Sequence, residues 1–292
     1  MIDTVIPFPP ALEAIAARLE AHASYRVLRA APPLDLIALS EPAGPLRVAV
    51  IIDTETTGLD RARDAIIDLA MVRVAFDPAG RIVRIGKLRN WLEDPGRPIP
   101  PEVTKLTGIT DAQVAGRRID EREACDLIIA ADVVIAHNAA FDAPIVERRL
   151  PAITGRAWAC SSYEVDWPGM GFDGRRLGHL LNQIGLFHQG HRAAADVRAL
   201  VHLLAHRLPG GETVLASLVD TASRPTWRLE ALGAAYSHKE ALKARGYRWS
   251  PSSRVWWTEV SAEALADERR WLELTCHVSP TERPVTWLTR HR

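Results

Sequence analysis

The chain has 292 residues, 47% of them hydrophobic, and its 36 lysines and arginines balance 36 aspartates and glutamates. A chain of this length can bury one substantial core and a second, smaller one. The balanced charge excludes a global field that would attract nucleic acid, so any such partner must be bound by a local patch.

The cysteines and the hydropathy pattern indicate where the protein resides. Cys125, Cys160 and Cys276 are far apart and lack metal-ligand spacing, which favours a reducing compartment. No apolar run reaches membrane-spanning length, and the N-terminal residues lack the pattern of a signal peptide. We therefore expect a cytoplasmic protein without a membrane partner.

Residues 1–46 are predicted to form an N-terminal extension. Three prolines in residues 1–10 predict an extended or disordered start, and the Ala/Leu/Glu/Arg-rich stretch 11–21 predicts a helix. Residues 25–28 and 34–39 are candidate short strands on either side of two prolines.

A buried strand that ends in two acids opens the next domain. Val48 to Ile52 are β-branched except for Ala49, which is typical of a strand buried on both faces. Asp53 and Glu55 follow, and their spacing places both carboxylates on one face of the strand. Such neighbours repel unless a cation lies between them, and hard oxygen ligands suit Mg²⁺ or Mn²⁺. Gly58 then permits a sharp turn.

The following stretch predicts an antiparallel meander and a crossover. Residues 65–76 and 81–91 alternate around an Asp-Pro-Ala-Gly turn, which predicts two more strands. A short helix is expected from residue 101, a longer one over 120–130, and a buried strand over 132–136.

Two more acids and a histidine stand at helix starts. Pro144 is tolerated only in a first turn, so we expect a helix to begin near Asp142. Asp196 lies inside a helix predicted within 190–207, and His191, five positions earlier, is expected on the preceding loop or first turn. Taken alone, Asp142 is equally explained as a helix cap, and His191 as a capping or solvated residue.

Three blocks of sequence carry a resemblance to a known family. Asp53-Thr54-Glu55-Thr56-Thr57-Gly58, His137-Asn138-Ala139-Ala140-Phe141-Asp142 and His191-Arg192-Ala193-Ala194-Ala195-Asp196 resemble the motifs of the DEDD-type 3′–5′ exonucleases with His in the third motif. This branch includes the proofreading epsilon subunit of bacterial DNA polymerase III. The likeness spans about residues 47–207, with all four acids and the histidine present.

The resemblance implies a fold, a cofactor and a site. The fold would be an α/β, ribonuclease H-like mixed sheet flanked by helices. Two Mg²⁺ or Mn²⁺ ions would be bound by Asp53, Glu55, Asp142 and Asp196, and His191 would act as general base. A histidine, with an unperturbed pKa of about 6.5, can accept a proton near neutral pH. The substrate-binding residues implied by the motifs are Thr54, Thr56, Gly58, Leu59, Thr107, His137, Asn138 and Phe141.

Beyond residue 222 the composition changes. Six of the nine tryptophans lie in residues 223–292, with twelve basic and eight acidic residues. A basic helix over 239–245, two strands over 247–249 and 254–257, and a closing helix over 262–274 predict a small α+β module. Residues 239–257 are similar to a small domain appended to primases and other DNA-processing proteins. The tryptophans either stack bases of a single strand or form the module's own core.

These interpretations divide the chain into an extension (1–46), an exonuclease domain (47–210), a linker helix (211–222) and a Trp-rich module (223–292). The expected activity is removal of nucleotides from single-stranded DNA 3′ ends, releasing nucleoside 5′-monophosphates, with a replication or repair protein as a further partner. An exoribonuclease and a non-catalytic nucleic-acid-binding module are the alternatives, since nothing in the motifs discriminates a 2′-hydroxyl.

Overall fold

The computed structural model describes residues 8–292, so the prediction for residues 1–7 lies outside the described residues. The described residues form two compact units, residues 8–221 with His291–Arg292, and residues 222–290. Among residues 8–292, no helix is both long enough and apolar enough to span a bilayer.

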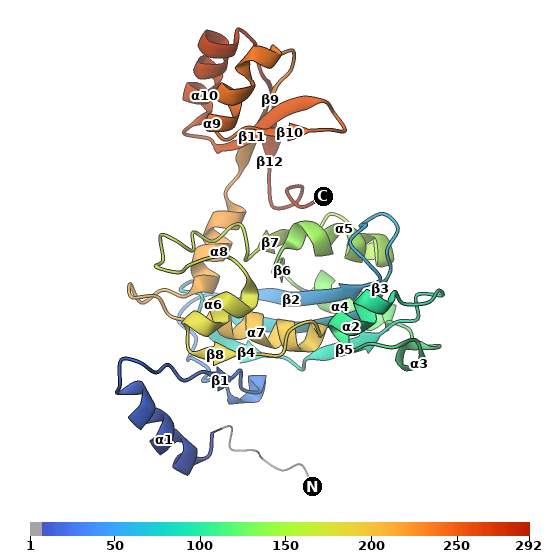
Figure 1. Cartoon of the computed structure of the whole chain (residues 1–292), viewed down its shortest axis with the longest axis vertical. Coiled ribbons are helices and arrows are strands. Elements are labelled where there is room, and N and C mark those ends of the chain that lie inside the picture. The colour runs from blue at the N-terminus through green and yellow to red at the C-terminus, as the bar shows by residue number, and fades with distance from the viewer. Residues whose placement is uncertain (1–7) are drawn as a thin grey trace. The chain divides into compact units, whose positions relative to one another are not determined.

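The first unit is built around a six-stranded mixed sheet (Figure 1). Five strands follow the order β4-β3-β2-β6-β7, and β5 also pairs with β3. β2 is antiparallel to β3 and parallel to β6, so the predicted meander followed by a crossover is confirmed. The single strand predicted over 81–91 is wrong, because this stretch forms two strands, β4 and β5, that each pair with β3. The strands are β2 (Arg47–Thr56), β3 (Ile66–Phe76), β4 (Ile82–Ile85), β5 (Arg89–Leu92), β6 (Val133–Ala136) and β7 (Trp158–Cys160).

Helices cover both faces of this sheet. They are α2 (Pro101–Thr107), α3 (Asp111–Val114), α4 (Glu121–Ile129), α5 (Ala139–Arg149), α6 (Leu177–Gln183), α7 (Ala193–Ala205) and α8 (Val214–Ser223). Ile128 of α4 and Ile145 of α5 pack with Ile52 of β2 in one buried cluster. α7 packs on β2 and β3 from the other face, where it is drawn in yellow in Figure 1. This is the ribonuclease H-like α/β architecture that the resemblance implied.

The secondary structure observed over residues 8–46 differs from the prediction in its strands. The helix α1 (Pro10–Glu20) agrees with the sequence, but residues 25–28 form no strand and 34–36 form a short 3-10 helix. Within residues 8–46 the one strand is β1 (Arg29–Ala30), which pairs in parallel with β8 (Leu186–Phe187). The prolines flanking this stretch cannot donate the backbone hydrogen bonds that longer strands require.

The helix that carries Asp142 begins earlier than predicted. α5 starts at Ala139, which places Pro144 inside the helix instead of in its first turn. A proline at this position leaves the carbonyl of residue 140 without its usual helical donor. Nη1 of Arg61 donates to the oxygen of Ala140 at 2.7 Å instead. This substitute donor offsets the hydrogen bond that Pro144 removes.

The second unit is a small α+β module, as predicted. Its four strands follow the order β10-β11-β9-β12, and Leu229, Leu242 and Leu272 lie in its core. The elements are β9 (Thr226–Ala231), α9 (Lys239–Ala244), β10 (Arg248–Ser250), β11 (Val255–Ser261), α10 (Leu265–Trp271) with a π-helix over Leu272–Cys276, and β12 (Thr281–Val285).

Tryptophans of the module lie in two environments, on opposite faces of its sheet. Trp227, Trp256 and Trp271 pack against the module's own core, which is the packing alternative of the sequence analysis. Trp257 lies on the other face of the sheet, with the guanidinium carbons of Arg228 and Arg248 each 4.0 Å from the centre of its ring. Two stacked arginines therefore already contact this ring.

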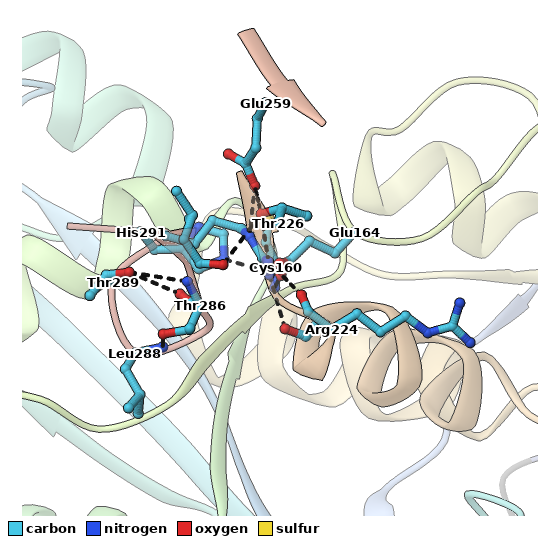
Figure 2. A network of polar contacts seen from close by, with 12 residues as sticks. Cys160, Glu164, Arg224, Thr226, Glu259, Thr286, Leu288, Thr289 and His291 are labelled. Carbon is cyan, nitrogen blue, oxygen red and sulfur yellow. Dashed lines mark hydrogen bonds and ion pairs between the residues drawn. The ribbon is translucent and has the colours of Figure 1, made fainter. Parts of the chain in front are cut away.

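The last two residues belong to the first unit. Nε2 of His291 lies 3.1 Å from Oε2 of Glu164, which also accepts the backbone N–H of Cys160 (Figure 2). Arg292 pairs with the buried Glu147 at 2.6 Å, and Glu147 also accepts the indole N–H of Trp158. Two buried carboxylates are thus satisfied by the final residues of the chain.

Candidate active site

Two antiparallel strands bring three carboxylates to one end of the sheet. Asp53 and Glu55 project from the same face of β2 because side chains alternate along a strand. In the register of β2 and β3, Glu55 lies directly opposite Asp68. Asp68 is fully buried and accepts a hydrogen bond from the side-chain amide of Asn90. Its other oxygen lies 3.2 Å from Nε of Arg192.

Asp142 reaches the site from the first turn of α5. Its side chain is buried, and its Oδ1 accepts a hydrogen bond of 2.7 Å from Oγ1 of Thr54. Thr54 stands between Asp53 and Glu55 on β2, so one strand supplies two carboxylates and also orients a third. Burial raises the pKa of Asp142 to about 7, and the hydrogen bond from Thr54 opposes that rise.

Asp196 enters from the first turn of α7, on the opposite face from α5. Its Oδ1 lies 2.9 Å from Nε2 of His188, and its Oδ2 accepts the backbone N–H of Arg192 at 3.2 Å. The loop before α7 turns sharply because His191 adopts a left-handed backbone, with φ of 67°. That turn carries the chain from His188 back to the start of the helix.

Oxygen atoms of Asp53, Glu55 and Asp196 lie within 4.8 Å of one another. Burial raises the pKa of Asp53 well above its usual range, and the charges of Asp142 and Asp196 raise it further. Burial also raises the pKa of Glu55 to about 8, with contributions from Asp196 and Asp68. Clustered carboxylates of this kind are held ionised by a cation, and an all-oxygen donor set fits Mg²⁺ or Mn²⁺.

His191 lies at the rim of this cluster. Its side chain is exposed, and it lines a cleft of about 760 Å³ together with His188 and Asp196. The sequence placed His191 on the loop or first turn before the helix, and it lies on the loop, two residues before α7. From that position the imidazole faces a solvent-filled cleft beside the carboxylates.

Gly58 is required by packing within the loop that follows β2. A Cβ at this position would lie 2.5 Å from Oδ2 of Asp64. The Asp64 carboxylate accepts hydrogen bonds from Thr57 Oγ1, from the backbone N–H of Asp60 and from Arg97. The glycine therefore makes room for a carboxylate that ties the whole loop together, and its own φ is not in the left-handed region.

Some side chains of the first motif hydrogen-bond within the protein, and others are exposed. Thr54 donates to Asp142, and Thr56 is buried and donates to the carbonyl of Gly58 at 2.6 Å. Leu59 is 86% exposed, so its side chain is free to contact a ligand. Thr107 is buried, donates to the carbonyl of Val103, and lines a cleft of about 590 Å³ that also contains His188.

The second motif contributes residues on both sides of the cleft. Both ring nitrogens of His137 have hydrogen-bond partners: Nδ1 lies 2.9 Å from Oγ of Ser161, and Nε2 lies 2.7 Å from the carbonyl oxygen of Arg175. Burial lowers the pKa of His137. Asn138 is exposed in the cleft with a left-handed backbone, whereas Phe141 packs against the core.

Two residues at the site were missed by sequence reasoning. Asp68 interrupts the apolar residues of β3, and pairing β2 with β3 around the predicted turn would have placed it opposite Glu55. His188 offers no such signal, because its distance from Asp196 depends on the conformation of a loop. Its Nδ1 is buried and, within residues 8–292, has no hydrogen-bond partner.

Comparisons with known proteins agree on one class. The family model RNase_T, described as Exonuclease, matches residues 50–204. The DNA polymerase III subunit epsilon of Treponema pallidum is 32% identical over 189 residues, covering 60% of this chain and 82% of that protein. The epsilon-like protein of Rhodobacter capsulatus is 32% identical over 218 residues, covering 72% of this chain but only 26% of that protein.

Solved structures show a looser likeness. A structure of Exonuclease X in complex with 5′ overhanging duplex DNA is 25% identical, covers 60% of this chain and 92% of that one, and has a TM-score of 0.42. An Exonuclease I structure without ligand is 16% identical, covers 84% of this chain and 65% of that one, and has a TM-score of 0.48.

Proposed function

The chain belongs to the RNase_T family of exonucleases, and from this premise we propose that it removes nucleotides one at a time from the 3′ ends of DNA, releasing nucleoside 5′-monophosphates. It is an enzyme of the 3′–5′ exonuclease class, a phosphodiester hydrolase. DNA is favoured over RNA because the relatives are named as DNA polymerase III subunits. The observation that carries the proposal is the convergence of Asp53, Glu55 and Asp196 within 4.8 Å.

We propose that Asp53, Glu55, Asp142 and Asp196 hold two divalent ions, Mg²⁺ or Mn²⁺. When bound, such ions neutralise the phosphodiester, acidify the attacking water and stabilise the departing oxygen. The support is the donor set: carboxylates from β2 and α7 converge within 4.8 Å, and the charge of Asp142 on α5 acts on Asp53 as well, so a cation would relieve their mutual repulsion.

The protein's own groups orient these carboxylates and move the proton. Thr54 and His188 each fix one carboxylate by a hydrogen bond, of 2.7 Å to Asp142 and 2.9 Å to Asp196. We assign the general base to His191, which is exposed at the cleft and can accept the proton of the attacking water there. Because its side chain is exposed, His191 can then release that proton to solvent.

The exposed residues around the cleft are proposed to seat the terminal nucleotides. Leu59, Gly58 and Asn138 present side chain or backbone to solvent, and Thr107 and His137 line the neighbouring clefts. The side chains of Thr54, Thr56 and Phe141 already hydrogen-bond or pack within the protein. We therefore propose that these three residues shape the site indirectly, by positioning their neighbours. A replication or repair protein is the partner suggested by the relatives' names.

The test is degradation of 5′-labelled single strands of DNA and RNA with Mn²⁺ or Mg²⁺, compared with Ca²⁺ and with Asp53→Ala. We expect a ladder of single-nucleotide steps on DNA that is absent in the variant and in Ca²⁺. An equal or stronger ladder on RNA would reassign the substrate. If neither metal supported a ladder, the exonuclease proposal would fail, and the alternative of a non-catalytic nucleic-acid-binding module would be favoured.

A further inference from the structure

A pocket lined by arginines lies at the end of the sheet that carries the acids. Its volume is about 610 Å³, and Ile66 of β3 and Ile145 of α5 form part of its wall. The cationic side chains that line it are Arg63, Arg117, Arg118, Arg148 and Arg149. Three acids also line it, namely Asp64, Glu93 and Asp94.

All three acids already accept hydrogen bonds within the protein. Asp64 pairs with Arg97 at 2.8 Å, and Glu93 accepts two hydrogen bonds from Arg149. Asp94 accepts the backbone N–H groups of Gly96 and Gly116, which lower its pKa. Arg97 and Arg149 thus offset the charges of Asp64 and Glu93, whereas Asp94 stays ionised and attracts Arg118.

Two of the arginines have no close polar contact, although the charge of Arg118 acts on Asp94. Arg117 and Arg118 follow α3 and are exposed, and within residues 8–292 neither guanidinium makes a hydrogen bond or an ion pair shorter than 4.0 Å. By contrast, Arg149 is held by Glu93 and Glu121. Arg117 and Arg118 thus keep their full hydrogen-bonding capacity for a ligand.

The same two arginines connect this pocket to the reaction site. They also line a second pocket, of about 340 Å³, together with Asn90 and Arg192. Arg192 pairs with Asp68, which lies opposite Glu55 in the sheet. A series of guanidiniums therefore leads from the carboxylate cluster, through Arg117 and Arg118, into the larger pocket.

We propose that Arg117 and Arg118 bind backbone phosphates of the nucleic-acid substrate, outside the reaction site, and hold the strand between successive cleavages. Guanidinium groups match phosphate in geometry and stay charged at every physiological pH. Phosphate contacts carry no sequence information, so binding by these arginines would be independent of sequence. No aromatic side chain lines the larger pocket, whereas Trp91 lines the second one. The inference rests on the proposed function, because it takes the strand in the reaction site as the source of the phosphates.

The experiment compares the double variant Arg117→Ala/Arg118→Ala with Arg73→Ala/Arg84→Ala. The control pair is also exposed, removes the same charge, and lines neither arginine pocket. Binding of a labelled DNA strand of about 30 nucleotides is measured by fluorescence anisotropy in Ca²⁺ at several salt concentrations. Hydrolysis of the same strand and of the p-nitrophenyl ester of thymidine 5′-monophosphate is measured in Mn²⁺.

We expect the double variant to bind the strand at least ~10-fold more weakly, with a salt dependence shallower by about 0.7 per lost phosphate contact. The ratio of activity on the strand to activity on the small ester should fall by a similar factor. Unchanged affinity and salt dependence would overturn the inference, as would an equal loss in the control pair or a parallel loss on the small ester.

The two proposals fail in different ways. If the wild-type protein hydrolysed neither the strand nor the ester, the proposed function would fall, while anisotropy would still measure strand binding by the arginines. If it hydrolysed both and the double variant bound normally, only the arginine assignment would fall.

Discussion

Nε2 of His188 lies 2.9 Å from Oδ1 of Asp196, and this contact fixes the orientation of a carboxylate proposed to bind metal. The other oxygen of Asp196 accepts the backbone N–H of Arg192. The imidazole is nearly buried, with 8% of its side chain exposed, so it has little freedom to leave. His188 is therefore a positioning residue, distinct from the exposed His191.

His188→Ala is expected to weaken metal binding by about 10–100-fold, the usual effect of removing a group that orients a ligand. Calorimetric titration with Mn²⁺ measures this effect without requiring turnover. His191→Ala provides the matched control, since it should leave Mn²⁺ affinity near wild type and lower the rate at saturating metal. Equal Mn²⁺ affinity in His188→Ala and the wild type would remove the positioning role.

Thr54→Val is expected to destabilise the metal-free protein by about 1–3 kcal/mol, because a buried carboxylate loses a hydrogen bond. Valine has nearly the shape of threonine, so packing around Asp142 is preserved. Chemical denaturation measures the cost, and Thr54→Ser, which keeps the hydroxyl, should retain most of the stability. Wild-type stability in Thr54→Val would show that the hydrogen bond to Asp142 contributes nothing to stability.

The meander, the crossover and the positions of four candidate acids could be read from local patterns and motif spacing, although the split of residues 81–91 into β4 and β5 could not. Val48 to Ile52 is a continuous apolar run, and the alternation after it specifies the hairpin. The start of α5 could not be predicted from Pro144 alone. Arg61, which satisfies the carbonyl of Ala140, lies 79 residues away in sequence. Tertiary contacts of this kind override a local rule and leave no pattern in the chain.

The arginine pocket was hidden from the sequence for a related reason. Basic and acidic residues balance over the chain, and Arg117 and Arg118 form no long basic run. Their significance comes from the fold, which places them beside Arg192 and also in a pocket where two of the three acids, Asp64 and Glu93, are already paired with other arginines. Charge composition reports the sum of charges, whereas binding depends on which of them remain uncompensated.

Gly58→Ala is expected to destabilise the protein by about 1–3 kcal/mol through overpacking against Asp64. The added Cβ would lie 2.5 Å from a carboxylate oxygen that Thr57 and Arg97 hold in place. Gly210→Ala is a matched control, because a Cβ there meets nothing within 4 Å. The cost should shrink in an Asp64→Ala background, and an undiminished cost would place the clash elsewhere.

The stability of the metal-free protein should fall as pH rises from about 4 to about 8. Burial raises the pKa of Glu55 to about 8 and that of Asp142 to about 7 in the folded state. Unfolded carboxyl groups titrate near pH 4, so over this range the folded state binds more protons and loses stability with increasing pH. Above about pH 8 both states are ionised at these positions, and the loss should level off.

Thermal denaturation in EDTA across this range measures the effect, and Glu55→Gln should make the decline shallower because one titrating group is removed. Saturating Mn²⁺ should restore the most stability at the alkaline end, where the carboxylates are ionised and bind metal without releasing protons. A wild-type curve that ran parallel to that of Glu55→Gln would show that Glu55 titrates alike in the folded and unfolded chains. That result would remove the electrostatic argument for a cation between Asp53, Glu55 and Asp196.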